Sequence, residues 1–158
     1  MVLFHVLLSL AGIVSGLVVL FAMINGRQPG GWTALFLATT ILTSATGFVL
    51  PSMGFDPARV VGVISLVALA AAVVALYGFH LRGAWRGTYV GTATFALYLN
   101  CFVGVVQAFQ KIPALHALAP KGSEPPFVVA QILLLGLFVI LGILALRRFR
   151  VTQPPLQA

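Results

Sequence analysis

The sequence predicts an all-α, polytopic membrane protein in which five transmembrane helices form a compact bundle. Its composition is 61% hydrophobic and only 7% charged, whereas about a quarter of the residues of a soluble domain are charged. Five apolar stretches of about 19–23 residues are each long enough to cross a hydrocarbon core of about 30 Å. The nine Lys and Arg and the two acids lie in connections, at segment ends or in the tail. That placement is expected, because a charge at the bilayer centre is unfavourable by several kcal/mol.

The first two apolar stretches are expected to be retained transmembrane helices. Residues 2–24 have no basic region before them and no small-residue cleavage site after them, so a signal peptide is disfavoured. This stretch ends at the segment 25–31, which is rich in Gly. The second stretch covers residues 32–50 and stops at Pro51. Both runs are continuously apolar rather than alternating, which favours helices over barrel strands.

Three further helices are expected along the rest of the chain. Residues 60–81 end at Arg82, residues 88–110 are closed by Lys111, and residues 127–146 precede an Arg-rich segment. Three of the four connections are short, so consecutive helices should be antiparallel neighbours. The fourth connection is long and rich in Pro, which is typical of a functional loop or of a spacer.

The charge distribution predicts the orientation of the chain. We expect a single transmembrane domain over residues 1–150 and a short, flexible cytoplasmic tail over residues 151–158. One side of the predicted bundle carries six Arg, while the other carries three basic residues and both acids. The positive-inside rule therefore places the N-terminus outside and the C-terminus in the cytoplasm. A small helical bundle of this kind, with no added targeting signal, favours a bacterial-type cell inner membrane.

Small residues predict where helices approach one another. Gly12 and Gly16 form a GxxxG pattern in the first helix, and Gly87 and Gly91 form another at the start of the fourth. In lipid such residues let two backbones pack closely. The spacing alone leaves open whether the partner helix belongs to the same chain or to a second copy in a homo-oligomer.

Neutral polar residues at membrane depth form two stripes. Thr39, Thr43 and Thr46 share one face of the second helix at i, i+4 and i+7. Their hydroxyls can bond back to carbonyls of the preceding turn, or they can line a polar pathway. Asn100 lies near the middle of the fourth helix, on a stripe with Gln107. Because a carboxamide in hydrocarbon loses several kcal/mol of hydrogen bonding, this stripe should face protein or water.

Gln131 in the fifth helix is a possible partner for the amide stripe, so the predicted pore or ligand lining has six members. The amides themselves have two interpretations, as interhelical polar contacts or as the lining of a cavity. The predicted lining residues are Thr39, Thr43, Thr46, Asn100, Gln107 and Gln131.

Metal, cofactor and catalytic signals are weak. His5, Asp56, His116 and Glu124 all belong to the predicted outer side and could in principle bind a divalent metal, but their spacing matches no metal motif. We therefore expect solvated loop residues and no cofactor. The sequence has no nucleophile constellation, phosphate-binding Gly loop or HExxH motif, so no catalytic residue is assigned and an enzyme is disfavoured. Nucleic acid is not an expected partner, because the basic residues cluster at helix ends.

Three functions of different classes agree with these features. The favoured one is an oligomeric channel or transporter for a small neutral or weakly polar solute. The second is an intramembrane binding protein for a lipophilic ligand such as a lipid or a quinone. The third is a non-catalytic accessory subunit of a larger membrane complex, docked through its GxxxG faces and its Arg-rich tail.

Overall fold

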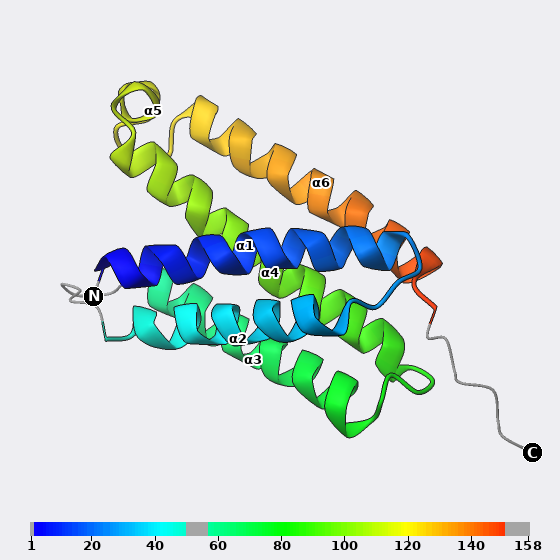
Figure 1. Cartoon of the computed structure of the whole chain (residues 1–158). Helices are drawn as coiled ribbons and strands as arrows, with labels where there is room; N and C mark the ends of the chain where they lie inside the picture. The colour runs from blue at the N-terminus through cyan, green and yellow to red at the C-terminus, as the bar shows by residue number, and fades with distance from the viewer. Residues whose placement is uncertain (1, 50–56, 151–158) are drawn as a thin grey trace, which may run out of the picture.

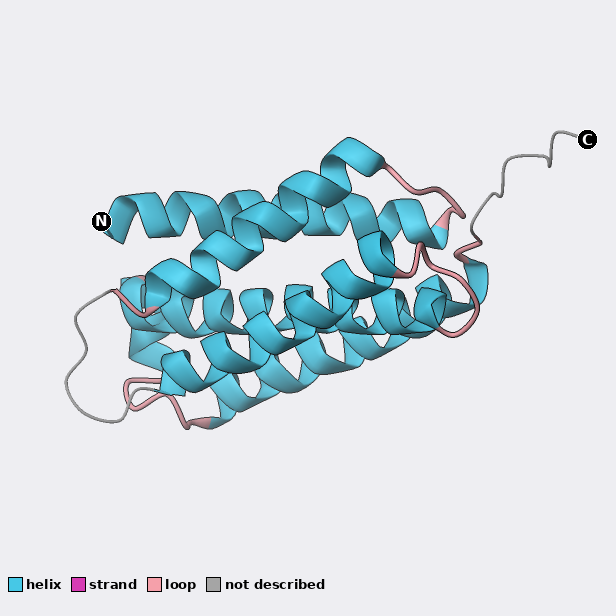
Figure 2. Ribbon diagram, turned by 90° about the horizontal axis from the view of Figure 1, so that it is seen from below, coloured by secondary structure: helices cyan, strands magenta, loops and turns pink. Residues whose placement is uncertain are grey.

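The structure is a computed structural model that describes residues 2–49 and 57–150. Five long helices run lengthwise beside one another, and a short sixth helix lies at one corner (Figure 1). Over the described ranges every regular element is helical and none is a strand (Figure 2). In chain order the elements are α1 (Val2–Ile24), α2 (Gly30–Gly47), α3 (Pro57–Val73) with its π-helical continuation η1 (Val74–Gly78), α4 (Trp85–Lys111), α5 (Pro113–Leu118) and α6 (Pro125–Arg148).

Consecutive long helices pack against each other, and α4 joins the two sides of the bundle. α1 contacts α2, α4 and α6, while α4 also contacts α3, η1 and α6. The apolar core lies where these helices meet, and it includes Leu20 of α1, Phe36 of α2, Leu69 of α3 and Leu97 of α4, each at most 1% exposed. The prediction that consecutive helices from α1 to α4 are neighbours is confirmed by these contacts, and Figure 1 shows that they run in opposite directions.

Four of the helices are long and apolar enough to cross a membrane. They are Leu3–Ile24, Arg59–Gly78, Trp85–Lys111 and Pro125–Arg148. α2 is not among them, because its 18 residues include many Thr, Ser and Gly, which lower its hydropathy. The prediction of an all-helical bundle is confirmed, and four of the described helices have the length and composition of membrane-spanning helices.

The end of α1 is fixed by its backbone. Gly26 has a φ of +72°, a conformation that glycine adopts without steric strain. The amide of Gly26 donates to the Met23 carbonyl at 3.0 Å, and the amide of Arg27 donates to the Ala22 carbonyl at 2.8 Å. This pair of bonds is a Schellman motif, which satisfies carbonyls left free by the last turn. It turns the chain sharply into α2.

Two helices end earlier than the sequence predicted. The third helix was expected to reach Leu81, but it widens into η1 and ends at Gly78. His80 and Leu81 then adopt φ values of +51° and +59°, which no α-helix accommodates. The second helix ends at Gly47 rather than at residue 50.

The fourth connection is partly ordered as a helix. α5 begins at Pro113, whose fixed φ suits the first position of a helix, and it continues through Ala and Leu residues with high helix propensity. α5 lies where α4 ends and α6 begins, at a corner of the bundle (Figure 1). The predicted tail, residues 151–158, lies outside the described residues.

Candidate functional site

A row of buried or half-buried polar side chains follows the interface between α1, α2 and α4. We call this row the polar seam. It continues along most of the length of these three helices, from the start of α1 and the end of α2 to the start of α4. Its members are His5, Ser9, Thr33, Thr39, Thr40, Thr43, Thr46, Tyr89 and Asn100.

Asn100 lies at the middle of the seam and is 8% exposed. Its carboxamide oxygen accepts a hydrogen bond from the Ser9 hydroxyl at 2.8 Å, and its Nδ2 donates to the Ser9 carbonyl at 3.4 Å. Tyr89, Ala93 and Ala96, which share its stripe on α4, are also buried. The stripe thus faces α1 and α2 rather than lipid. This is expected, because an amide without a hydrogen-bond partner is unfavourable in hydrocarbon.

The threonines of α2 bond mainly within their own helix. The hydroxyls of Thr39, Thr43 and Thr46 each donate to the carbonyl four residues earlier, at 2.7 to 2.8 Å. This back-bonding satisfies each donor without a partner on another helix. Each hydroxyl oxygen can still accept a hydrogen bond from a second partner.

The seam begins at the N-terminal end of α1. His5 Nδ1 lies 2.9 Å from the Thr46 hydroxyl, so the start of α1 is joined to the end of α2.

Gln107 is half-buried one to two turns beyond Asn100 on α4. No hydrogen bond involves its side chain within the described part of the chain.

Three buried hydroxyls on the seam have no hydrogen-bond partner among the described residues. They belong to Thr33, Thr40 and Tyr89. The Tyr89 and Thr33 hydroxyls lie near each other in the orientation of a weak hydrogen bond, but their contact falls short of full hydrogen-bond geometry. A buried polar group without a partner costs about 1–3 kcal/mol, so three along one seam require an explanation.

The first GxxxG pattern lies directly on the seam. A Cβ added to Gly12 would come within 2.9 Å of Thr40 Oγ1 and 3.0 Å of Asn100 Nδ2. A Cβ on Gly16 would come within 2.8 Å of the Phe36 ring. These two glycines therefore let α1 approach α2 and α4 of the same chain.

The second GxxxG pattern is in a more open position. A Cβ on Gly87 would lie 4.0 Å from Leu146 of α6, and a Cβ on Gly91 would meet nothing within 4 Å. The same GxxxG spacing therefore marks close helix packing on α1 but not on α4.

Gln131 lies away from the seam, although the sequence suggested that it could face the amide stripe. Its Nε2 donates to the Phe102 carbonyl at 3.3 Å, which joins α6 to α4. Its Oε1 is buried and has no partner among the described residues. Gln131 therefore belongs to a second, separate polar contact.

The weak metal candidates that lie among the described residues form no cluster. No group of three or more His, Cys, Asp or Glu within residues 2–49 and 57–150 could hold a metal ion. His5 bonds to Thr46, His116 is exposed on α5, and Asp56 lies outside the described residues. Glu124 accepts hydrogen bonds from the backbone amides of Lys121 and Ser123, at 2.9 and 3.0 Å. These bonds lower the pKa of the Glu124 carboxyl, and the bond from Lys121 has the largest effect.

Sequence reasoning missed the role of Ser9 and the end of α6. Ser9, Gly12 and Gly16 fall at i, i+3 and i+7, so their shared face could have suggested the Ser9 contact. By contrast, Phe149 is fully buried, and Arg86 donates to its carbonyl and, at 3.1 Å, to that of Leu146. No local pattern in the sequence indicates this anchor.

We expect the Ser9–Asn100 pair to contribute measurably to the stability of the bundle. Asn100→Leu and Ser9→Ala should each lower the free energy of unfolding, and a double-mutant cycle should give a coupling of about 1 kcal/mol. Unfolding by a denaturing detergent, followed by circular dichroism, measures each value. Strictly additive effects of the two substitutions would contradict a direct contact.

No protein family, curated protein or solved structure that was compared matches this chain.

Proposed function

We propose that the chain is a five-span protein of a bacterial-type inner membrane, with α2 as the additional crossing. The contact between His5 and Thr46 supports this, because it joins the start of α1 to the end of α2. Eighteen residues of helix extend about 27 Å, close to the thickness of the hydrocarbon core. The burial of Thr33, Thr39 and Thr40 keeps the hydroxyls of α2 away from lipid.

The proposed orientation has the N-terminus outside and the C-terminus in the cytoplasm. It rests on the six arginines that lie near the ends of α1, η1 and α6 and the start of α4. Homo-oligomers are part of the proposal, since only 6% of the residues in the most apolar stretch of α6 are buried within the chain.

The proposed function is the passage of a small neutral or weakly polar solute along the polar seam. The observation that carries this proposal is the set of unpartnered hydroxyls on Thr33, Thr40 and Tyr89. A solute or water moving along the seam would provide the hydrogen bonds that the protein leaves unmade. The seam carries no buried full charge, which favours a neutral solute over an ion.

An apolar block divides the seam into two polar segments. Phe36 and Leu97 meet at Gly16, one helical turn from Thr40 and Asn100. Thr33 and Tyr89 lie beyond this block, toward the end of α1. A hydrophobic constriction of this kind gates a pathway by excluding water until the helices separate. In the proposed function, Phe36 and Leu97 form this gate.

Thr40→Val tests the proposal because it removes an unpartnered hydroxyl and preserves the shape of the side chain. We expect the uptake of glycerol or urea into proteoliposomes to fall several-fold, while thermal stability stays the same or rises, since no hydrogen bond within the protein is lost. Stopped-flow light scattering gives the uptake rate.

Thr92→Val is the matched control for Thr40→Val. The Thr92 hydroxyl is bonded to the Thr88 carbonyl of its own helix, at 2.7 Å. Its removal should leave uptake unchanged. Wild-type uptake no faster than in protein-free liposomes, or equal uptake by Thr40→Val and wild type, would refute passage along the seam.

A second candidate function is the binding of a lipophilic molecule between α4 and α6. It is favoured by the buried, unpartnered Oε1 of Gln131. It is also favoured by the aromatic rings nearby, where Tyr98 lies 5.8 Å from Phe138 between ring centroids. A quinone or lipid carrying a hydrogen-bond donor could satisfy that oxygen. Native mass spectrometry after mild extraction would detect such a ligand, and its loss in Gln131→Leu would assign the site.

A further inference from the structure

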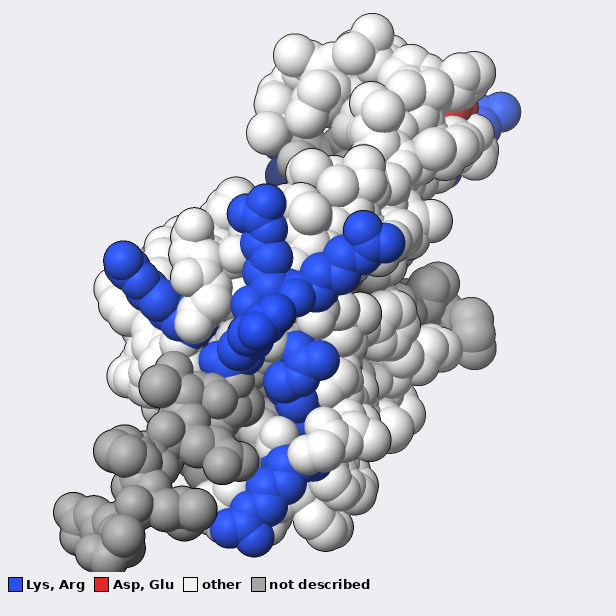
Figure 3. Space-filling model, turned by 90° about the vertical axis from the view of Figure 1, so that its right-hand side faces the viewer, with Lys and Arg blue, Asp and Glu red and all other residues white. Residues whose placement is uncertain are grey.

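One end of the bundle gathers positive charge on a single face. Arg side chains cluster there around the C-terminal end of α6 (Figure 3). Neither acid of the chain balances them within the described residues, because Glu124 precedes the opposite end of α6 and Asp56 lies outside those residues. The basic residues at the helix ends on this side are Arg27, Arg82, Arg86, Arg147, Arg148 and Arg150.

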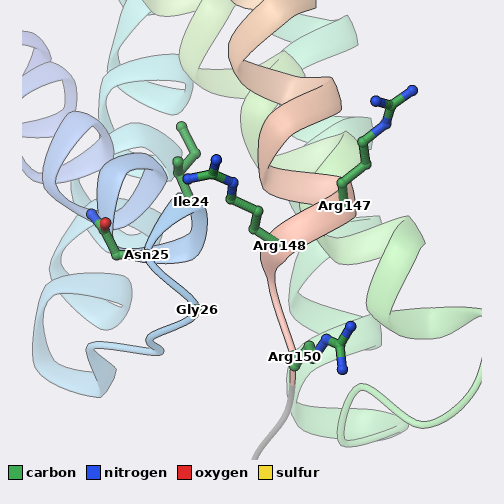
Figure 4. A pocket seen from close by; sticks show the side chains of 6 residues that line it. All are labelled: Ile24, Asn25, Gly26, Arg147, Arg148 and Arg150. Carbon is green, nitrogen blue, oxygen red and sulfur yellow. The ribbon is translucent and has the colours of Figure 1, made fainter.

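A pocket of about 430 Å³ lies within this basic end, between the turn after α1 and the end of α6. Arg148 extends across it toward Ile24, whereas the side chains of Arg147 and Arg150 start from the same wall and point away from Ile24 (Figure 4). The complete lining is Ile24, Asn25, Gly26, Arg147, Arg148 and Arg150.

The backbone holds the two walls of the pocket in place. The Schellman turn after α1 fixes Gly26, and a Cβ there would lie 3.7 Å from the Arg148 carbonyl. The Asn25 side chain donates to the Phe21 carbonyl at 2.8 Å, so it is fixed on its own helix. Phe149, fully buried next to the pocket residues, anchors the other wall.

The guanidinium group of Arg148 in the pocket, and those of Arg147 and Arg150 at its edge, are exposed to a ligand. Arg147, Arg148 and Arg150 make no ion pair or hydrogen bond with any other residue in the described part of the chain. The carbonyls of Leu146 and Phe149, which would repel an anion at the C-terminal end of α6, are occupied by Arg86. The site therefore combines unpaired positive charge with carbonyls that are already satisfied.

We propose that this pocket binds the phosphate headgroup of an anionic membrane lipid. Guanidinium groups bind phosphate oxygens in bidentate geometry, and basic pockets between transmembrane helices at a membrane surface recognise anionic headgroups. The acyl chains would follow the apolar surface of α6, where Ile140 and Ile143 are 60% and 45% exposed. This site is separate from the polar seam and does not depend on solute passage.

The test uses the full chain in mild detergent, with phosphatidylglycerol, phosphatidylcholine or inorganic phosphate added. Native mass spectrometry should show phosphatidylglycerol adducts on the wild type that phosphatidylcholine does not form. Arg148→Gln with Arg150→Gln should weaken that binding about 30-fold. Arg82→Gln with Arg27→Gln, which removes the same charge from the same end but outside the pocket, should weaken it only a few-fold.

Three results would overturn the proposal. One is equal loss of lipid by the two double variants, because that would make binding a property of general surface charge. Another is equal binding of the two lipids. The third is a thermal stabilisation by inorganic phosphate as large as that by phosphatidylglycerol, which would make the pocket a site for a free anion. Thermal unfolding of each variant without lipid verifies that the bundle is intact.

Discussion

Gly16→Ala is expected to destabilise the bundle by about 1–3 kcal/mol, and Gly16→Leu to prevent it from folding. A Cβ at this position would lie 2.5 Å from Leu97 Cδ1 and 2.8 Å from two carbons of the Phe36 ring. Both neighbours are only 1% exposed and are enclosed by the core, so neither side chain can move aside. The helices would have to separate along the α1 interface.

The matched control for Gly16 is Gly136, in the middle of α6. A Cβ at Gly136 meets nothing within 4 Å. Because Ala has a higher helix propensity than Gly, Gly136→Ala should be neutral or slightly stabilising. Thermal unfolding in detergent and fluorescence-detected size exclusion measure both variants. Equal melting temperatures for the two Ala variants would show that α1 does not pack as described.

Phe149→Ala is expected to release the C-terminal end of α6, with a loss of about 3 kcal/mol. Only 6% of the residues in the most apolar stretch of α6 are buried, compared with 33% to 44% in the other three helices that could cross a membrane. The helix is therefore held by few side chains, mainly Phe138, Ala145 and Phe149, which are 6%, 0% and 0% exposed. Removing the ring would also end its contact with Tyr89, whose centroid lies 6.2 Å away.

Hydrogen exchange of the last turns of α6 measures this release directly. Exchange there should become faster in Phe149→Ala, while α2 should keep its protection. Leu133→Ala is the control on the same helix, because Leu133 is 68% exposed and contributes little to packing. Unchanged exchange in Phe149→Ala would mean that Arg86 alone holds the helix end. Arg86→Lys, which keeps the charge but loses the planar fork, would then be expected to release it.

The buried ring of Phe149 also changes the expectation for the Arg-rich segment at residues 147–150. The accessory-subunit hypothesis assigned the Arg-rich segment to docking with a larger complex. Phe149 is fully buried in its own chain and its carbonyl accepts from Arg86, so its side chain is not available to a partner. The surrounding arginines remain accessible, and they are the residues to which the lipid proposal gives a role.

The hydropathy and charge of the sequence determined the helices and their approximate ends. A full charge is too unfavourable in hydrocarbon to be tolerated without a partner, so the chain positions of Arg, Lys and the acids marked most boundaries. The same reasoning predicted that Asn100 would be shielded from lipid, and its side chain is buried. These features depend on local composition and on helical periodicity, both of which are visible in one sequence.

The tertiary structure decided which neighbour each face meets. Helical spacing gave Gly12 and Gly16 the same pattern as Gly87 and Gly91, yet only the first pair lies in close contact with other helices. Helical spacing also did not identify the hydrogen-bond partner of Asn100. In the structure that partner is Ser9, whereas Gln131 bonds to the Phe102 carbonyl. A sequence specifies which side of a helix is small or polar. The identity of the opposing residue depends on how several helices pack together in space, because contacts between distant segments leave no periodic signal along the chain.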